Sequence, residues 1–403
     1  MATLFGEGLV WPDYGGACIT QLGPLAGRCL GVGEAGVGIA LAEERRYRRV
    51  VLVILDALGY EATQHFAERV PSLARMLQRA ELHRLTSVFP STTTVALTSI
   101  YGAATPAEHG LLGHQVFMPE LGGIGDMLRY SPRGRSKRDA YLDEGIDSRA
   151  LFPMETIFQR LKEAGVACTF LSRAEFRRSG LGRLHHPGAK YVGYRHLADF
   201  GVMLRRALVD SRAPAFLCGY WDIVDVLSHP YGPRSEEVAA AVDLAFHTLE
   251  RELFEQTPAS ARAETLLLVT ADHGHIEAPP ADAVALGEHP EIVAELLLPP
   301  TGGTRAGYLH ARPGRAEALR EALAPLADRI AIAPTAEAVE AGLWGDPAAA
   351  RLRTVTLGDF TFQCRAGHTL LPPDRRRDSV RAVSRHGGLS PDEMHVPLLV
   401  LPM

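Results

Sequence analysis

The sequence is poor in lysine and in cysteine, and each shortage narrows what the protein can be. Only Lys137, Lys162 and Lys190 stand beside a large excess of arginine, and the formal net charge is -5. A chain with this acidic balance is not expected to bind nucleic-acid polymers. The five cysteines are scattered and form no CxxC pair, which argues against a disulfide framework and against a thiolate metal site.

Long apolar segments are missing as well. No uninterrupted apolar run is long enough to span a bilayer. The first residues do not combine a basic run with an apolar stretch, so they show no signal pattern. We therefore expect a cytoplasmic protein that has no membrane partner.

What the sequence does contain is an alternation of apolar strands and amphipathic helices. Its 403 residues, 46% of them hydrophobic, suit one large domain or two ordinary ones. A continuous apolar run from Arg49 predicts a buried, parallel strand, and similar runs predict further strands that begin near residues 166, 214, 264 and 396. Helical periodicity predicts helices over residues 61–82, 153–165, 196–209 and 235–256. This alternation predicts an α/β layered architecture with a mostly parallel central sheet.

Shifts in composition suggest how the chain is divided. Residues 1–47, rich in glycine and proline, are expected to form an arm that packs on the core. Residues 48–275 form the first part of an α/β core, and residues 368–403 return to it. Between them, residues 276–367 are rich in alanine, proline and glycine and predict a small α/β cap subdomain.

The central stretch runs from Ser87 to Gly110 and reads as a strand end, a tight turn and the start of a helix. Thr92, Thr93 and Thr94 lie where the helix begins. Free backbone N–H groups and the positive end of the helix dipole make such a place suitable for a phosphate. Hydroxyl residues also cap helices for structural reasons alone, so this stretch by itself leaves both readings open.

Oxygen and nitrogen ligands follow several other predicted strands. A lone aspartate or histidine at a strand end is commonly a helix cap, but several together suit Zn²⁺ and related divalent ions. Two metal ions would need about this many ligands. The candidates are Asp56, the threonines near Thr93, Asp225 with His229, Asp272 with His273, and His386.

These motifs in combination resemble the alkaline phosphatase superfamily, and most closely its type I phosphodiesterase/nucleotide pyrophosphatase branch. The similar segments are VLVILDALGY, FPSTTTVALTSI with TPAEHG, DVLSHPYGP, TADHGH and HGGLSPDEMHVPLLV. The resemblance covers most of the chain from about residue 49 onward. It implies an alkaline phosphatase-like layered α/β/α core with a cap insert.

The resemblance also implies a site with two divalent metal ions, with Zn²⁺ expected and Mn²⁺ or Fe permitted. Thr93 would be the nucleophile and would form a phospho-threonine intermediate, with its hydroxyl activated by a bound cation. One ion would be held by Asp225, His229 and His386. The other would be held by Asp56, Asp272, His273 and the Thr93 oxygen.

Some assignments stay open at this stage. A shift of one residue would make Thr92 or Thr94 the nucleophile, and Asp222 is a weaker rival of Asp225 as a ligand. His275 can approach the site or cap a turn, and the capping role is the expectation. His114 stands 21 residues after Thr93, where eukaryotic-type relatives carry an asparagine that contacts a phosphoryl oxygen. A histidine can donate a similar hydrogen bond, but nucleotide specificity is then in doubt.

The function expected from these features is hydrolysis of phosphodiesters or pyrophosphates in a small substrate, such as a nucleotide. The alternative is a phosphomonoesterase, because the basic segments Arg129–Arg138 and Arg375–Arg377 can hold additional phosphate charge. A sulfatase is disfavoured because no cysteine has the required context. A metal-binding scaffold without activity is a third reading, although no ligand position is missing. The sequence leaves the oligomeric state open.

Overall fold

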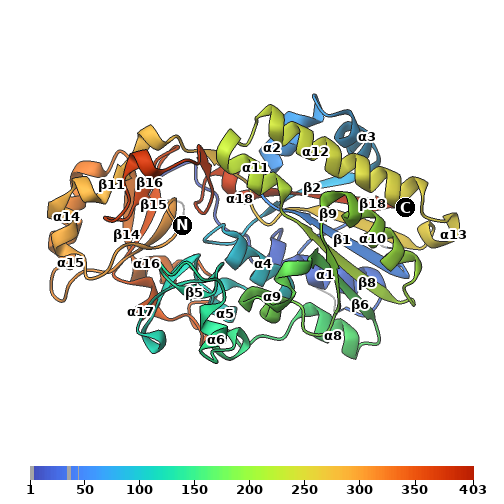
Figure 1. The fold of residues 1–403 in the computed structure, drawn as a ribbon, viewed down its shortest axis with the longest axis horizontal. Helices are drawn as coiled ribbons and strands as arrows, with labels where there is room; N and C mark the ends of the chain where they lie inside the picture. The colour runs from blue at the N-terminus through green and yellow to red at the C-terminus, as the bar shows by residue number, and fades with distance from the viewer. Residues whose placement is uncertain (1–3, 34–37, 44) are drawn as a thin grey trace.

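The computed structural model describes residues 4–33, 38–43 and 45–403, and two seven-stranded sheets organise it. Figure 1 shows the two sheets in separate halves of the molecule. The first sheet has the order β2-β18-β9-β1-β8-β6-β7. Its strands are β2 (Glu81–Thr86), β18 (His395–Pro402), β9 (Thr265–Thr270), β1 (Arg49–Leu55), β8 (Ala215–Trp221), β6 (Ala167–Arg173) and β7 (Lys190–Tyr194).

The middle of this sheet is parallel, as the apolar runs predict. Strands β9, β1, β8, β6 and β7 run in one direction, whereas β18 lies antiparallel between β9 and β2. In β1 every residue after Arg49 is buried. Strands covered on both faces need apolar side chains at every position rather than at alternate positions. The expectation of an α/β fold with a mostly parallel sheet is therefore confirmed.

Helices cover both faces of the first sheet (Figure 1). One group contains α1 (Leu22–Leu30), α4 (Thr93–Gly102) and α8 (Ile157–Glu163), with α1 against β1 and α8 against β6. The other contains α2 (Tyr60–Ala67), α3 (Pro71–Arg79), α10 (Leu197–Val209) and α12 (Glu236–Leu249). Within the described residues, no helix is both long enough and apolar enough to cross a bilayer.

The helix expected over residues 61–82 is two helices followed by a strand. Pro71 occupies the first turn of α3, where its missing N–H costs no hydrogen bond. The chain leaves the helical conformation at Ala80 and enters β2 at Glu81. Pairing with β18 takes these last residues into the sheet, so tertiary contacts override their helical pattern.

The second sheet is antiparallel and has the order β14-β15-β13-β12-β3-β4-β5. Its strands are β14 (Ile330–Pro334), β15 (Phe360–Cys364), β13 (Ala306–Leu309), β12 (Thr301–Gly302), β3 (Gln115–Met118), β4 (Gly123–Asp126) and β5 (Ser131–Pro132). Strands β3 to β5 come from a stretch that composition assigns to the core. They join the sheet of the 276–367 segment through a pairing of Gly302 with Gln115. The domain boundaries themselves stay a prediction.

Smaller elements complete the two halves. Residues of the N-terminal arm contribute to both: Leu22 is buried in the core of the first sheet, and Phe5 is buried with Phe89 and Trp344 under the second. Two short pairings, β10 (Ile276–Glu277) with β17 (Ser384–Arg385) and β11 (Ala283–Ala285) with β16 (Thr369–Leu371), join the segment that follows β9 to the segment that precedes β18. The remaining α-helices are α5 (Pro106–His109), α6 (Ala140–Asp143), α7 (Ser148–Leu151), α9 (Gly180–His185), α11 (Ile223–Tyr231), α13 (Ala259–Arg262), α14 (Pro290–Glu295), α15 (Ala316–Leu323), α16 (Thr335–Glu340), α17 (Thr354–Leu357) and α18 (Pro391–Met394).

A buried ion pair ties the two halves together. Arg305, which precedes β13, and Glu393, which lies in α18, are both 0% exposed. Two bonds join them: Nε to Oε1 at 3.1 Å and Nη2 to Oε2 at 3.0 Å. The Glu393 carboxylate also accepts from the backbone N–H of Gly388 at 2.9 Å and from the Ser390 hydroxyl at 2.6 Å. The second sheet is thereby fixed to the loop that carries His386.

Replacing Arg305 by methionine should destabilise the protein by about 3–5 kcal/mol, because the Glu393 charge would stay buried without its partner. Urea unfolding measures this loss. The control is Arg315→Met, which breaks a bidentate pair with Glu295 on the surface and should change stability little. Equal stability of the two variants would show that the buried pair does not hold the halves together.

Candidate active site

The carboxyl edge of the first sheet gathers most of the candidate ligands. Asp56 directly follows β1, and Asp272 and His273 follow β9. Asp225 lies in the first turn of α11, which follows β8, and its backbone N–H donates to the Asp56 carbonyl at 3.1 Å. Because β8, β1 and β9 are adjacent and parallel, their ends meet at one edge, the place where open α/β sheets put their chemistry.

Four of the predicted ligands form a first group around His273. Its Nε2 lies 3.6 Å from Asp56 Oδ1, 3.5 Å from Asp272 Oδ2 and 3.1 Å from the Thr93 hydroxyl oxygen. A tetrahedral zinc ion with bonds of about 2.0–2.1 Å separates its ligand atoms by about 3.3 Å. The spacing of the group therefore fits one small divalent cation.

The two carboxylates of this group each leave one oxygen atom free. Tyr220 donates its hydroxyl to Asp56 Oδ2, and the backbone N–H groups of Ala57 and His273 donate to Asp272 Oδ1 at 3.1 and 3.0 Å. Asp56 Oδ1 and Asp272 Oδ2 are buried and have no hydrogen-bond partner among the described residues. Buried unpaired carboxylate oxygens are costly, and a cation at this position would satisfy both.

A second group surrounds Asp225 Oδ1. The Nε2 atoms of His229 and His386 lie 3.5 and 3.7 Å from this oxygen. His275, from the loop after β9, approaches it more closely, with its Nε2 at 2.9 Å. The ligand atoms of all four residues lie within 4.8 Å of one another, and Asp225 also lies within that distance of Asp56 and His273. The two groups are therefore neighbours, with Asp225 between them.

Each imidazole in these groups has its Nδ1 atom occupied by a protein oxygen. His273 Nδ1 lies 3.0 Å from the Gly274 carbonyl, His229 Nδ1 3.1 Å from the Ser384 carbonyl, and His386 Nδ1 3.1 Å from the Ser91 carbonyl. A carbonyl can only accept, so the Nδ1 atoms of His273 and His386 carry the proton and their Nε2 atoms present a lone pair to the site. Metal-binding histidines are oriented in this way.

The expectation that His275 caps a turn is wrong. Ser384 donates its one hydroxyl proton to the Ser228 carbonyl at 2.6 Å, so it accepts from His275 Nδ1 at 2.8 Å. The neutral His275 ring then turns the Nε2 lone pair toward the Asp225 carboxylate. Two acceptors 2.9 Å apart need a cation between or beside them. The sequence signal for this was the second histidine of TADHGH, two residues after His273.

Glycine is required between the two histidines that follow β9. A Cβ atom on Gly274 would lie 2.0 Å from the Asp392 carbonyl oxygen, far inside van der Waals contact. Gly59, after Asp56, meets Gly274 in the same place, since its Cβ would lie 2.9 Å from the Gly274 Cα atom. These contacts pack the loops after β1 and β9 together, which sets the distance between Asp56 and His273.

The three threonines at the start of α4 differ in their surroundings. Thr92 and Thr94 are buried, and their hydroxyls lie 3.3 Å apart, with Thr94 donating to the Gly113 carbonyl. Thr93 is partly exposed, lines the cavity and directs its hydroxyl at His273. The rival ligand Asp222 forms a bidentate pair with Arg173, at 2.6 and 2.9 Å, so its carboxylate is already neutralised.

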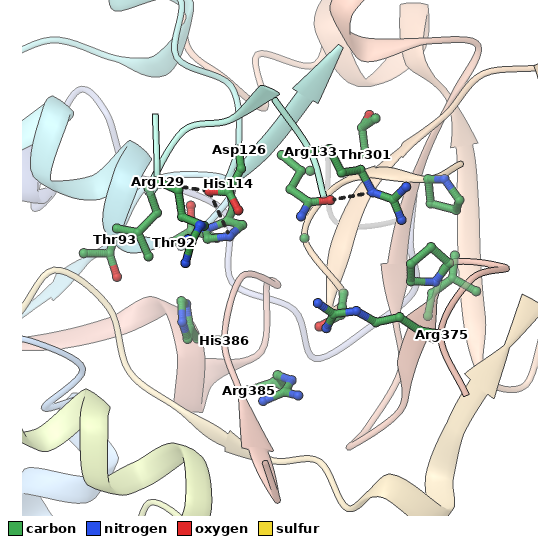
Figure 2. A pocket seen from close by; sticks show the side chains of 18 of the residues that line it. Thr92, Thr93, His114, Asp126, Arg129, Arg133, Thr301, Arg375, Arg385 and His386 are labelled. Atoms are coloured by element: carbon green, nitrogen blue, oxygen red, sulfur yellow. Dashed lines mark hydrogen bonds and ion pairs between the residues drawn. The ribbon is translucent and has the colours of Figure 1, made fainter. Parts of the chain in front are cut away.

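A cavity of about 550 Å³ opens over these groups and extends under the second sheet. Thr93, His114, Asp225, His229 and His386 line one end of it. Figure 2 shows Thr93 and His114 toward one side, Arg375 toward the other, and His386 and Arg385 below and between them. His114 Nε2 lies 3.7 Å from Asp126 Oδ1.

The charges in the site are unbalanced in a way that a cation would correct. Burial, and then the charges of Asp272 and Asp225, raise the pKa of Asp56 well above its ordinary value. Burial would also raise the pKa of Asp225, but the close approach of His275 and the charge that the neighbouring histidines carry when protonated lower it below its ordinary value. Burial lowers the pKa of His386 and of His114, so neutral imidazoles face several carboxylates.

The fold and the site together define an α/β protein with a centre suited to divalent cations and to an oxyanion beside a hydroxyl group. Residues 50–340 match the family model of type I phosphodiesterase/nucleotide pyrophosphatase. The chain belongs to that family within the alkaline phosphatase superfamily, and it is a hydrolase that acts on phosphoric ester bonds.

Solved structures show the same fold at low sequence identity. Murine ectonucleotide pyrophosphatase/phosphodiesterase 5, in an inactive form in complex with AMP, is 15% identical with a TM-score of 0.66, and the match covers 88% of each chain. Phosphonoacetate hydrolase from Sinorhizobium meliloti 1021, in complex with phosphonoacetate, is 19% identical with a TM-score of 0.63, covering 89% of this chain and 92% of that one. No curated protein matches the chain by sequence.

Removing divalent ions with a chelator should lower the melting temperature by roughly 3–8 °C, because ions bound to the native state stabilise it by mass action. Zn²⁺ or Mn²⁺ added in excess should restore it. Differential scanning calorimetry measures the shift. An unchanged melting temperature, with no metal found in the purified protein, would show that the two groups do not hold ions.

Metal binding should also strengthen as the pH rises and should release protons. The pKa of Asp56 is raised in the folded protein, and it must lose its proton to act as a ligand. Without ions, protonated Asp56 stabilises the folded protein at low pH. This stability is lost as the pH rises from 3.8, the ordinary pKa of an aspartate, toward the raised pKa of Asp56 in the folded protein. Titration calorimetry in buffers of different ionisation enthalpy counts the released protons, and binding independent of pH would contradict the assignment.

Proposed function

We propose that the protein hydrolyses phosphodiester or pyrophosphate bonds of small substrates with Thr93 as the nucleophile and two divalent metal ions, expected to be Zn²⁺. The observation that carries this proposal is the convergence of Thr93, Asp56, Asp272 and His273 at ligand spacing beside the group of Asp225. The orphaned oxygens of Asp56 and Asp272 support an ion at the first group. His229 and His386, with Asp225, support an ion at the second.

When bound, these ions supply Lewis-acid charge that lowers the pKa of the Thr93 hydroxyl and stabilises the leaving oxygen. Thr93 lies at the N-terminus of α4, where free backbone N–H groups favour a phosphoryl group. Its oxygen attacks phosphorus in line with the leaving oxygen, which departs as a phospho-threonine forms. Water then attacks this intermediate and returns Thr93 with its proton.

The substrate is positioned by side chains along the cavity. His114 lies near Asp126, and a neutral imidazole there can donate one N–H to a non-bridging phosphoryl oxygen. His275, held by Ser384, orients the Asp225 carboxylate or adds a fourth protein ligand to that ion. The inner end of the cavity therefore contacts the reacting phosphoryl group.

The structural relatives support this substrate class without defining it. One is an inactive form bound to AMP, a phosphate ester, and the other is a hydrolase bound to phosphonoacetate. Both ligands are small and carry phosphorus. We accordingly propose a small phosphorylated substrate, and a cytoplasmic location remains part of the proposal.

Replacing Thr93 by valine, which keeps the shape and removes the hydroxyl, should reduce kcat for bis-p-nitrophenyl phosphate by about 10³-fold or more. Thr93→Ser should retain much of the activity because it keeps the nucleophilic oxygen. Hydrolysis is followed by release of p-nitrophenol from the metal-loaded protein. The metal content of each variant is measured in parallel, and full activity of a metal-loaded Thr93→Val protein would refute the assignment.

Replacing His114 by alanine should reduce kcat/KM by about 10²-fold, the usual loss on removal of one donor to a transition-state oxygen. His114→Asn keeps a donor at this position and should recover part of the loss. If both variants keep wild-type kcat/KM for the diester, His114 does not contact the phosphoryl group.

A further inference from the structure

Two arginines that line the cavity, Arg375 and Arg385, are set apart by their partners. Of the other arginines on the rim, Arg133 pairs with Asp374 at 2.7 Å and Arg135 pairs with Glu144, whereas Arg129 donates to the Ser136 carbonyl rather than to a carboxylate. For Arg375 and Arg385, no carboxylate within ion-pair distance is found in the described part of the chain.

Arg385 and Arg375 line the same cavity. Arg385 is half-buried in β17, and its guanidinium group contacts His229 and the Ser384 carbonyl rather than a carboxylate. Figure 2 shows both guanidinium groups reaching into the same part of the cavity, away from Thr93. Two guanidinium groups that share a cavity without a directly paired carboxylate are suited to an oxyanion, which would offset both charges through bidentate hydrogen bonds.

The position of Arg385 separates it from the reacting phosphoryl group. Its Nη1 lies 3.3 Å from His229 Nδ1, the ring nitrogen opposite the Nε2 that faces Asp225. The guanidinium group is therefore about one imidazole ring farther out than the ligand atoms. An anion held there belongs to another part of the substrate than the phosphorus that Thr93 attacks.

We propose that Arg375 and Arg385 form a subsite for a second anionic group, a carboxylate or a phosphate, carried by the organic part of the substrate. This inference rests on the proposed function, because the reacting phosphoryl group fixes the other end of the substrate. It narrows the substrate class to phosphoric esters or anhydrides with a second negative charge a few atoms from phosphorus.

Calorimetric binding to the zinc-loaded protein tests the subsite without turnover. Three probes are compared: 3-phosphonopropionate, its neutral amide, and methylphosphonate. The acid should bind at least about 10-fold more tightly than the amide, as expected for charge-assisted bonds to arginine. In the Arg375→Gln and Arg385→Gln proteins, the ratio of the affinity for the acid to the affinity for the amide should fall toward 1. Ethane-1,2-diphosphonate in place of the acid distinguishes a phosphate subsite from a carboxylate one.

The matched control is Arg377→Gln, which lies in the same segment but pairs with Glu288 at 2.7 Å outside the cavity. It should keep the preference for the acid. Equal binding of acid and amide by the wild-type protein would overturn the inference. The inference would also be overturned if the arginine variants bound methylphosphonate as much more weakly as they bound the acid. The arginines would then hold the reacting phosphoryl group, as in a phosphomonoesterase.

Hydrolysis of bis-p-nitrophenyl phosphate by the same preparations reports on the proposed function separately. If the wild-type protein binds the acid in preference to the amide but hydrolyses no ester, the proposed activity fails and the anion subsite stands. If it hydrolyses the diester but shows no preference, the subsite fails alone. The metal content of the Arg385→Gln protein is also measured. An unchanged metal content excludes an indirect effect of the substitution through the neighbouring His229.

Discussion

The crowding of carboxylates at the carboxyl edge of the first sheet is the constraint on which the rest of the structure depends. Asp56, Asp225 and Asp272 approach one another, and two of them keep a buried oxygen without a partner among the described residues. Such an arrangement is costly by itself, and a cation shared by the carboxylates would offset the cost. The close packing of Gly59 on Gly274 and the hydrogen bonds that orient each histidine have the same effect. They hold ligand atoms at distances that a divalent ion spans.

Much of this centre could be predicted from the sequence because its ligands follow the signals that define the strands. Continuous apolar runs predict parallel strands, and the residues after such strands must meet at one edge. Asp56, Asp272 and His273 lie where this argument places them. The choice between Thr92, Thr93 and Thr94 depends on which hydroxyl is partly exposed and which are tied to their neighbours. Periodicity and composition do not contain that information.

Other features depend on contacts between residues far apart in the chain, and the sequence carries a weak signal for them or none. His275 is two residues from a predicted ligand, but its orientation is set by Ser384, more than a hundred residues away. Strands β3 to β5 join the second sheet through one short pairing at Gly302, which no local pattern indicates. The unbalanced charge of Arg385 becomes evident only when the surrounding carboxylates are seen to pair elsewhere. Sequence patterns report local preference and burial, whereas these features are matters of long-range contact.

The two halves of the molecule consequently contribute different parts of the cavity. In the proposed mechanism, the groups that act on phosphorus follow strands of the first sheet, and they would tolerate little displacement because ligand spacing decides whether an ion is held. The second sheet and the segment after it supply the outer cavity wall, including Arg375. The buried pair of Arg305 with Glu393 connects the two, since Glu393 also binds the backbone of Gly388 beside His386. Under the proposed function, substitutions on the outer wall would therefore change which organic group is accepted while the position of His386 stays fixed. Specificity would then vary without loss of the proposed chemistry.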